Sequence, residues 1–127
     1  MTNIFLKRVY EAYDESDGAR ILIDRLWPRG VSKEKARLTD WFKEVAPSPE
    51  LCKWFSHKPE RFEEFRDKYL DELRTSDVKL GLINQILMMA SKGKVTLLYG
   101  SKDQVHNQAQ VLFAELTRMM EENKSIG

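Results

Sequence analysis

Apolar residues along this chain occur in two patterns, short continuous runs and longer stretches with helical spacing. Ile21–Ile23 is a continuous run, and the other short segments are Ile4–Leu6 with Val9 and Val95–Tyr99, which is apolar except for Thr96. A continuous apolar run is typical of a strand that is covered on both faces of a sheet. The sequence therefore predicts at least three short strands, and Val95–Tyr99 is the clearest of them.

Most of the remaining apolar residues recur every three or four positions, which predicts amphipathic helices. The stripes are Phe62, Phe65, Tyr69 and Leu73; Leu82, Ile83, Ile86, Leu87 and Ala90, ended by Gly93; and Val105, Ala109, Leu112, Leu116 and Met119. Shorter helices are predicted after Ser32 and at Pro49, because serine caps helices and proline suits their first turn. Ser76 or Asp77 is expected to cap the helix that carries the second stripe.

Strands separated by helices indicate an α/β fold, with a small parallel or mixed sheet and helices on both faces. We expect a single three-layer domain over residues 4–119 and a polar C-terminal tail over residues 120–127. No internal repeat or linker divides the sequence.

Composition narrows the classes of function. The chain has 127 residues, with 21 basic and 20 acidic side chains, so a broad basic face for nucleic acid is not favoured. One cysteine, Cys52, excludes a disulfide framework and a multi-cysteine zinc site, and it fits a reducing cytoplasm. No apolar run is long enough to span a bilayer. We expect a cytoplasmic protein without metal, cofactor or membrane association, and its oligomeric state is left open.

The loop after the second predicted strand, Asp24–Gly30, is the most informative stretch. It places Asp24, Arg25, Trp27 and Arg29 on a turn stiffened by proline. Arginine is a rigid bidentate donor to carboxylates and phosphates, so the pair Arg25 and Arg29 indicates an anion site in one shared cavity. The alternative is structural, with Arg25 and Asp24 pairing with other buried charges and Trp27 filling the core.

A second polar loop follows the last predicted strand. Its candidate ligand-binding residues are Tyr99, Ser101, Lys102 and Asn107, and His106 is a candidate catalytic residue. The S-x-x-Q spacing from Ser101 to Gln104 predicts a capping box that opens the last helix, and a helix N-terminus attracts anions. The two polar loops converge if their strands are neighbours, because ligands bind at the carboxyl ends of parallel strands.

The histidines and the cysteine each allow a functional and a structural interpretation. His106, in the first turn of the predicted helix, would suit proton transfer, or it bonds Asp103 or Tyr99. His57 either joins an anion site or is a loop residue, and we favour the loop. Cys52, beside Leu51 and Trp54, is predicted to be buried and unreactive.

Three segments together resemble the YeaO-like family, a branch of the domain-of-unknown-function family DUF488. The segments are Asp24–Gly30; Trp54–Phe62; and Val95–Tyr99 with Lys102, Asp103, His106 and Asn107. The resemblance runs from about Ile4 to Met119 and implies a compact cytoplasmic α/β protein, but no reaction. The chain departs from the family pattern at Lys58 and Phe62. It also has Tyr99 and no thiol where longer relatives carry a cysteine.

The leading functional hypothesis is a pocket for a small anionic molecule, phosphorylated or carboxylated, at the carboxyl edge of the sheet. Arg25, Arg29 and Lys102 would hold the charge, and Asp24 would orient Arg25. Whether the protein is also an enzyme is left open. The rival hypothesis is a non-catalytic module that docks a protein or nucleic acid through the arginine and tryptophan loop. A concave pocket near a histidine would favour the first hypothesis, and a flat surface with exposed Trp27 the second.

Overall fold

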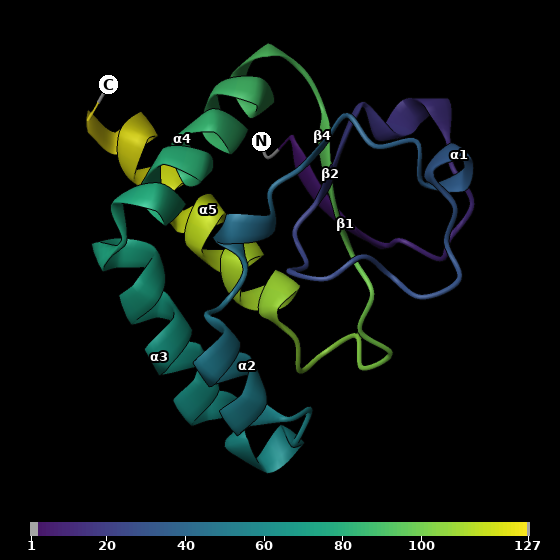
Figure 1. Ribbon diagram of the computed structural model, residues 1–127. Coiled ribbons are helices and arrows are strands. Elements are labelled where there is room, and N and C mark those ends of the chain that lie inside the picture. Colours follow the sequence, from purple (N-terminus) through teal and green to yellow (C-terminus); the bar gives the residue numbers. More distant parts are fainter. Residues whose placement is uncertain (1–2, 127) are drawn as a thin grey trace.

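The sheet has four parallel strands. A computed structural model describes residues 3–126 of the chain (Figure 1). The strands are β1 (Ile4–Arg8), β2 (Ala19–Leu22), β3 (Asp40–Trp41) and β4 (Val95–Tyr99), in the order β1-β4-β2-β3. The three predicted strands are confirmed, and β3 is a two-residue strand at one edge.

Strand β4 lies between β1 and β2, and all five of its residues are buried. This explains why its residues are apolar except for Thr96, whose hydroxyl donates to the Asp17 carbonyl at 2.7 Å. Leu22 is in register with Leu98, and the Ile23 N–H donates to the Leu98 carbonyl at 3.1 Å. The carboxyl ends of β2 and β4 therefore lie side by side, as the convergence of the two polar loops requires.

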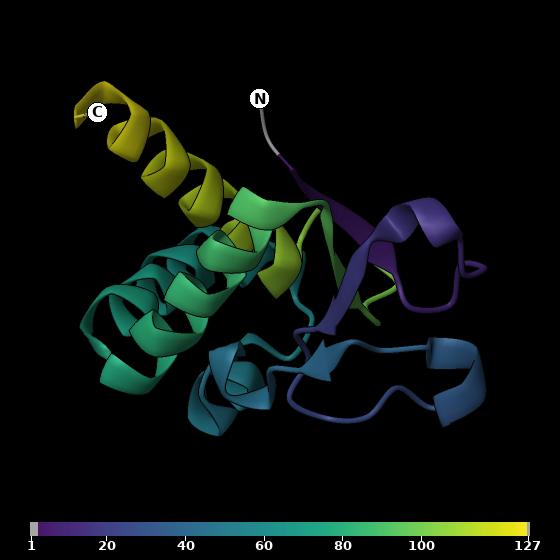
Figure 2. The same cartoon turned by 90° about the horizontal axis from the view of Figure 1, so that it is seen from above.

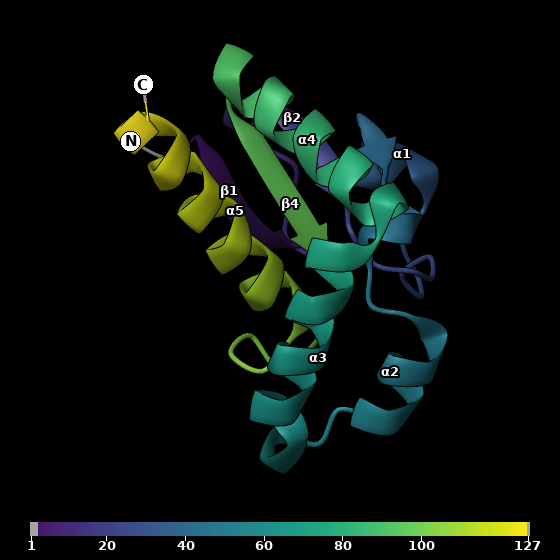
Figure 3. The ribbon, with the colours of Figure 1, turned by 90° about the vertical axis from the view of Figure 1, so that its left-hand side faces the viewer.

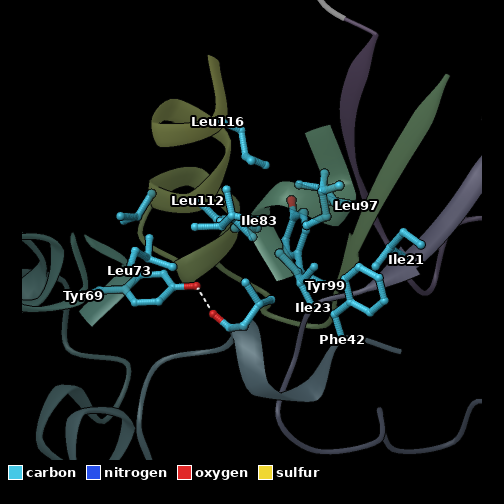
Figure 4. Close-up of a cluster of buried hydrophobic side chains, with 14 of the residues drawn as sticks. Ile21, Ile23, Phe42, Tyr69, Leu73, Ile83, Leu97, Tyr99, Leu112 and Leu116 are labelled. Carbon is cyan, nitrogen blue, oxygen red and sulfur yellow. Dashed lines mark hydrogen bonds between the residues drawn. The ribbon is translucent and has the colours of Figure 1, made fainter. Parts of the chain in front are cut away.

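Four helices lie on one side of the sheet: α2 (Pro49–Phe55), α3 (Phe62–Thr75), α4 (Asp77–Lys92) and α5 (Gln108–Ile126). Helices α4 and α5 lie against the strands, and α3 packs on these two helices and α2 on α3 (Figures 2 and 3). Figure 4 shows the core between them, where Ile21 and Leu97 from the sheet meet Leu73 and Leu112 from the helices. The Tyr69 hydroxyl, also in this core, donates to the Val45 carbonyl at 2.7 Å. The predicted apolar stripes thus form one contiguous core.

Local capping explains where most helices begin. Ser48 and Ser76 accept the backbone N–H groups of Leu51 and Lys79, and Pro49 occupies the first turn of α2. The short 3-10 helices η1 (Glu15–Asp17), η2 (Lys43–Val45) and η3 (Pro59–Arg61) complete the connections. These starts follow from residues within one turn of each helix, so the sequence predicted them.

The other face of the sheet is covered by the segment 24–39, which contains the one-turn helix α1 (Lys33–Ala36), capped by Ser32 as predicted. A second apolar cluster of Val9, Leu22 and Leu98 lies under this segment. Trp27 packs edge to face on Trp41 with ring centroids 5.4 Å apart. The domain therefore has three layers, with a single-turn helix on its second face.

The start of α5 corrects a prediction. The helix begins at Gln108, and Asn107 is its cap, since the Asn107 Oδ1 accepts the Gln110 N–H at 3.1 Å. Ser101 does not cap it, because the Ser101 hydroxyl donates to the Asp103 carbonyl. The Asp103 carboxylate instead accepts the N–H groups of Val105 and His106 and holds this stretch as a loop. At its other end α5 continues through Ile126, so it takes in most of the predicted tail.

The amino edge of the sheet holds a buried ionic cluster. Asp17 accepts Arg20 at 2.5 Å and Lys7 at 3.0 Å, and Arg20 also donates twice to the Ala36 carbonyl. Arg20 is 1% exposed, so its charge is fully desolvated. The cluster joins β1, β2 and α1 at the end of the sheet opposite the two polar loops.

Candidate functional site

Two adjoining cavities lie at the carboxyl ends of β2 and β4. The Arg25 cavity has a volume of about 520 Å³, and the Lys102 cavity about 540 Å³. Both are lined by Asp24, Leu26, His57, Ser101 and Gln108. The two predicted polar loops therefore meet at one concave site, with His57 added from the turn between α2 and η3.

Asp24 lies where the two cavities meet. Its Oδ2 accepts the Gly100 N–H at 2.8 Å, and its Oδ1 accepts the Gln108 Nε2 at 2.5 Å. Burial raises the pKa of Asp24, and these hydrogen bonds only partly offset that effect. A Cβ at Gly100 would lie 3.1 Å from the carboxylate, so glycine gives the loop room to approach. Asp24 thus fastens the β2 loop to the β4 loop, and the prediction that it orients Arg25 is wrong.

The Arg25 guanidinium is held by the backbone that precedes α2. Its Nε donates to the Pro47 carbonyl at 3.1 Å, its second amino group donates to the Ala46 carbonyl at 3.3 Å, and Glu44 lies 3.4 Å from the first. Three of its five N–H donors are used in these contacts. Arg25 therefore lines its cavity with a fixed orientation and with N–H donors to spare.

Arg29 does not join Arg25. It is exposed, and it does not line either cavity; its backbone carbonyl accepts the Tyr10 hydroxyl at 3.0 Å. Lys102 is also exposed but lines its own cavity. The structure thus separates the three predicted anion-binding cations, and only Arg25 lines the Arg25 cavity.

His106 pairs with Asp103. The His106 Nδ1 lies 2.9 Å from the Asp103 Oδ2, and the ring packs edge to face on Phe62 at 5.3 Å. The backbone N–H groups of His106 and Val105, together with the His106 ring, lower the pKa of Asp103 to about 2. His106 lines the Arg25 cavity, but it precedes the first turn of α5. The structural alternative, a bond to Asp103, is confirmed.

The anion site predicted around Lys102 and His106 does not coincide with the N-terminus of α5, which begins at Gln108. The amides of Val105 and His106 precede the helix and are bonded to the Asp103 carboxylate, so they are not free for a phosphate. The protein's own acidic side chain thus fills the position where the sequence predicted an anion.

Of the remaining predicted residues, some line the cavities and others are buried in the protein interior. Ser101 lines both cavities, and Trp27 lines the Lys102 cavity while its indole N–H is bonded to the Val31 carbonyl at 2.7 Å. Tyr99 is buried in the core, and Asn107 is buried as the cap of α5; neither lines a cavity. Trp27 is therefore a packed, half-buried residue and not the centre of a flat exposed surface.

Cys52 corrects another prediction, because it is exposed and lines the Arg25 cavity. Its neighbours Leu51 and Phe55 face the core, but Cys52 lies on a different side of α2. Partial burial raises the pKa of the Cys52 thiol, although Arg25 acts in the opposite direction. The thiolate is thus disfavoured, and Cys52 is accessible without being activated.

Of the five residues that line both cavities, sequence reasoning missed three. Gln108 and Leu26 carried no chemical signal of their own, and His57 was interpreted as a loop residue. That interpretation is correct, since His57 has φ 56° in the turn after α2, but the turn places it beside both cavities. Its place within the family-like segment Trp54–Phe62 was the one available signal.

Residues 3–126 contain neither a cluster of metal ligands nor a membrane-spanning helix. No group of three or more His, Cys, Asp or Glu within residues 3–126 could hold a metal ion. No helix in the same range is long and apolar enough to cross a membrane.

Comparison with known proteins identifies the family. A family model described as the inactive DUF488-N3 subclade matches residues 3–126. The uncharacterized protein YeaO of Escherichia coli is 44% identical over 110 residues, which cover 87% of this chain and 93% of that protein. The uncharacterized protein Rv3073c of Mycobacterium tuberculosis is 38% identical over 111 residues, 87% of this chain and 91% of that one. No solved structure matches the chain significantly. The chain therefore belongs to the YeaO-like DUF488 family.

Proposed function

We propose that this protein binds a small anionic molecule, carboxylated or phosphorylated, in the Arg25 cavity and does not transform it. The observation that carries the proposal is the fixed Arg25 guanidinium at the wall of a cavity of about 520 Å³. A volume of this size suits a small-molecule ligand. Arg25 is oriented before a ligand arrives, so binding would cost little side-chain entropy.

The other lining groups fit the same kind of ligand. Phe55, Phe65, Pro47 and Pro49 form apolar walls, and Ser101 and His57 offer hydrogen bonds. A few polar groups among apolar walls are typical of small-molecule sites. We infer that Arg25 binds the acidic group while the walls bury the rest of the molecule.

Binding without chemistry is supported by two observations. The matching family model is described as an inactive subclade. The one thiol in the cavity, Cys52, has a raised pKa, so it is a poor nucleophile at neutral pH. The Asp103–His106 pair then serves to position the loop.

A thermal-shift screen of phosphorylated and carboxylated metabolites tests the proposal. We expect at least one compound to raise the melting temperature of the wild-type protein, because a ligand of the native state stabilises it. Arg25→Ala should abolish this rise. Arg29→Ala is the matched control, since it removes an arginine from the same loop outside the cavity, and its response should equal that of the wild type. Equal responses in the two variants, or no response to any anion in the wild type, would refute the proposal.

A further inference from the structure

The Asp24 carboxylate has no cationic partner among residues 3–126. We propose that Asp24 forms a second subsite, for an ammonium group, so that the ligand is a small zwitterion with its amine at Asp24 and its acidic group at Arg25. This inference rests on the proposed function and specifies the ligand class of the same cavity. The two residues are adjacent in sequence, and both line the Arg25 cavity.

The first argument is the missing partner of Asp24. Its hydrogen bonds come from a neutral amide N–H and a neutral side-chain amide, those of Gly100 and Gln108. Among the ion pairs of residues 3–126, none involves Asp24. A carboxylate removed from water without a cation is unfavourable, so a bound ammonium group would supply the missing charge.

The second argument is geometric. A carboxylate has about four acceptor positions, and Gly100 and Gln108 use two of them. The two neutral donors come from the β4 loop and from α5, so they fix the carboxylate where both cavities meet. Two acceptor positions of the carboxylate thus have no donor among residues 3–126, and Asp24 lines the Arg25 cavity.

The basic side chains near the site are not bonded to the Asp24 carboxylate. Arg25 is bonded to the backbone at Ala46 and Pro47. His57 and His106 also line the Arg25 cavity, and neither forms an ion pair with Asp24. Among residues 3–126, no basic side chain is therefore bonded to the Asp24 carboxylate.

The apolar walls define the rest of the ligand. Phe55 and Phe65 are stacked with ring centroids 4.3 Å apart, and both line the Arg25 cavity together with Pro49. These walls would contact an apolar or aromatic body. The chemical class is thus an α-amino acid, or a short peptide, with an apolar side chain.

Three matched probes separate the two charges. At pH 8 phenylalanine carries both charges, N-acetylphenylalanine only the negative one, and 2-phenylethylamine only the positive one. Calorimetric titration at pH 8 should show that phenylalanine binds at least about tenfold more tightly than either derivative, as expected when one charge-assisted hydrogen bond is lost. Equal affinity of phenylalanine and its N-acetyl derivative would overturn the ammonium subsite and leave the proposed anion site standing. Binding of none of the three probes would overturn the inference, and the anion screen decides the proposed function separately.

Asp24→Asn tests the carboxylate directly. Asparagine can accept the Gly100 N–H through its oxygen, and Gln108 can turn its amide to accept the new NH₂ group, so the local structure is kept. This variant should lose the preference for phenylalanine over N-acetylphenylalanine. Glu50→Gln is the control, because it removes one negative charge from α2 outside both cavities, and it should keep the preference. An Asp24→Asn variant that still unfolds cooperatively and keeps the preference for phenylalanine would overturn the subsite.

Discussion

Two aspartates flank strand β2, and they differ in whether a positively charged side chain neutralises them. Asp17, on the amino side, is 5% exposed and bonded to both Arg20 and Lys7. Asp24, on the carboxyl side, is partly buried and bonded only to neutral groups. The first closes a cluster that joins β1, β2 and α1, whereas the second borders two open cavities.

The pKa shifts express this difference. Burial by itself would raise the pKa of Asp17, but hydrogen bonds from Lys7, the Asp14 backbone and Arg20 outweigh it, so the pKa is lowered. For Asp24 burial prevails, and the pKa is raised. A charge that the protein neutralises itself stabilises the fold, while one left without a cation is available for a ligand. The comparison therefore separates a structural carboxylate from a candidate binding one.

Removing the Asp17 charge should produce the largest effect. Asp17→Asn leaves Arg20 charged and buried without its counter-ion, so the free energy of unfolding should fall by about 3–5 kcal/mol. Urea denaturation at pH 7 measures this loss. Because the pKa is lowered in the fold, the Asp17 contribution is present above the unfolded value and is lost as pH falls through the folded value. The loss should therefore shrink in acid. A loss below about 1 kcal/mol at pH 7, the size typical of surface pairs, would contradict the structural role.

The cap of α5 should give an intermediate effect. Asn107→Ala removes the acceptor of the Gln110 N–H and loosens the helix start that presents Gln108 to Asp24, so it should cost about 1 kcal/mol in urea denaturation. Ser101→Ala is the paired variant and should stay within about 0.5 kcal/mol of wild type, because Ser101 does not cap the helix. A larger loss of stability in Ser101→Ala than in Asn107→Ala would instead support the capping box at Ser101 that the sequence predicted.

Removing the Asp24 charge should change stability least, and in the opposite direction to Asp17. Asp24→Asn should leave the free energy of unfolding unchanged or raise it by up to about 1 kcal/mol at pH 7, since an unpaired carboxylate no longer has to be desolvated. The raised pKa means that the stabilising contribution of this carboxyl is present below its unfolded pKa and is lost as pH rises through the folded pKa. Any gain in the variant should therefore vanish towards pH 4. A loss of more than about 2 kcal/mol would show that the carboxylate is structural after all.

Labelling of the Cys52 thiol measures how accessible the Arg25 cavity is and requires no substitution in the protein. Cys52 is exposed in the Arg25 cavity, so it should be labelled in the native protein, but more slowly than free cysteine because its pKa is raised. The rate at pH 7.5 can be followed with a chromogenic disulfide reagent. A bound ligand should slow it further. Labelling that requires denaturant would show that the cavity is closed.

Several elements could be predicted because their causes lie within a few residues. The strand Val95–Tyr99 is apolar at every position except Thr96, and Ser32, Ser48 and Ser76 each cap the helix that follows. The loop Asp24–Gly30 contributes Asp24, Arg25 and Trp27 to the lining of the two cavities, and their binding of a ligand stays a prediction. In each of these cases the residues that explain the structure are neighbours in the sequence.

The errors arose where two local patterns competed or where the direction of a side chain mattered. The sequence predicted a cap at Ser101. In the structure the side chains of Asp103 and Asn107 accept the backbone N–H groups instead, further along the chain. Arg25 and Arg29 look alike in sequence, yet one lines a cavity and the other is exposed. Cys52 has apolar neighbours but lies on another side of α2.

The sequence by itself determined the α/β class, the family and the edge of the sheet where polar residues gather, because apolar periodicity and capping act over a few residues. Only the tertiary structure decided the roles within that edge. Gln108 meets Asp24 across 84 positions, and Arg25 meets the Pro47 carbonyl across 22. The partners of a charged side chain depend on which distant segments pack beside it. The packing of those segments depends in turn on the burial of the whole core.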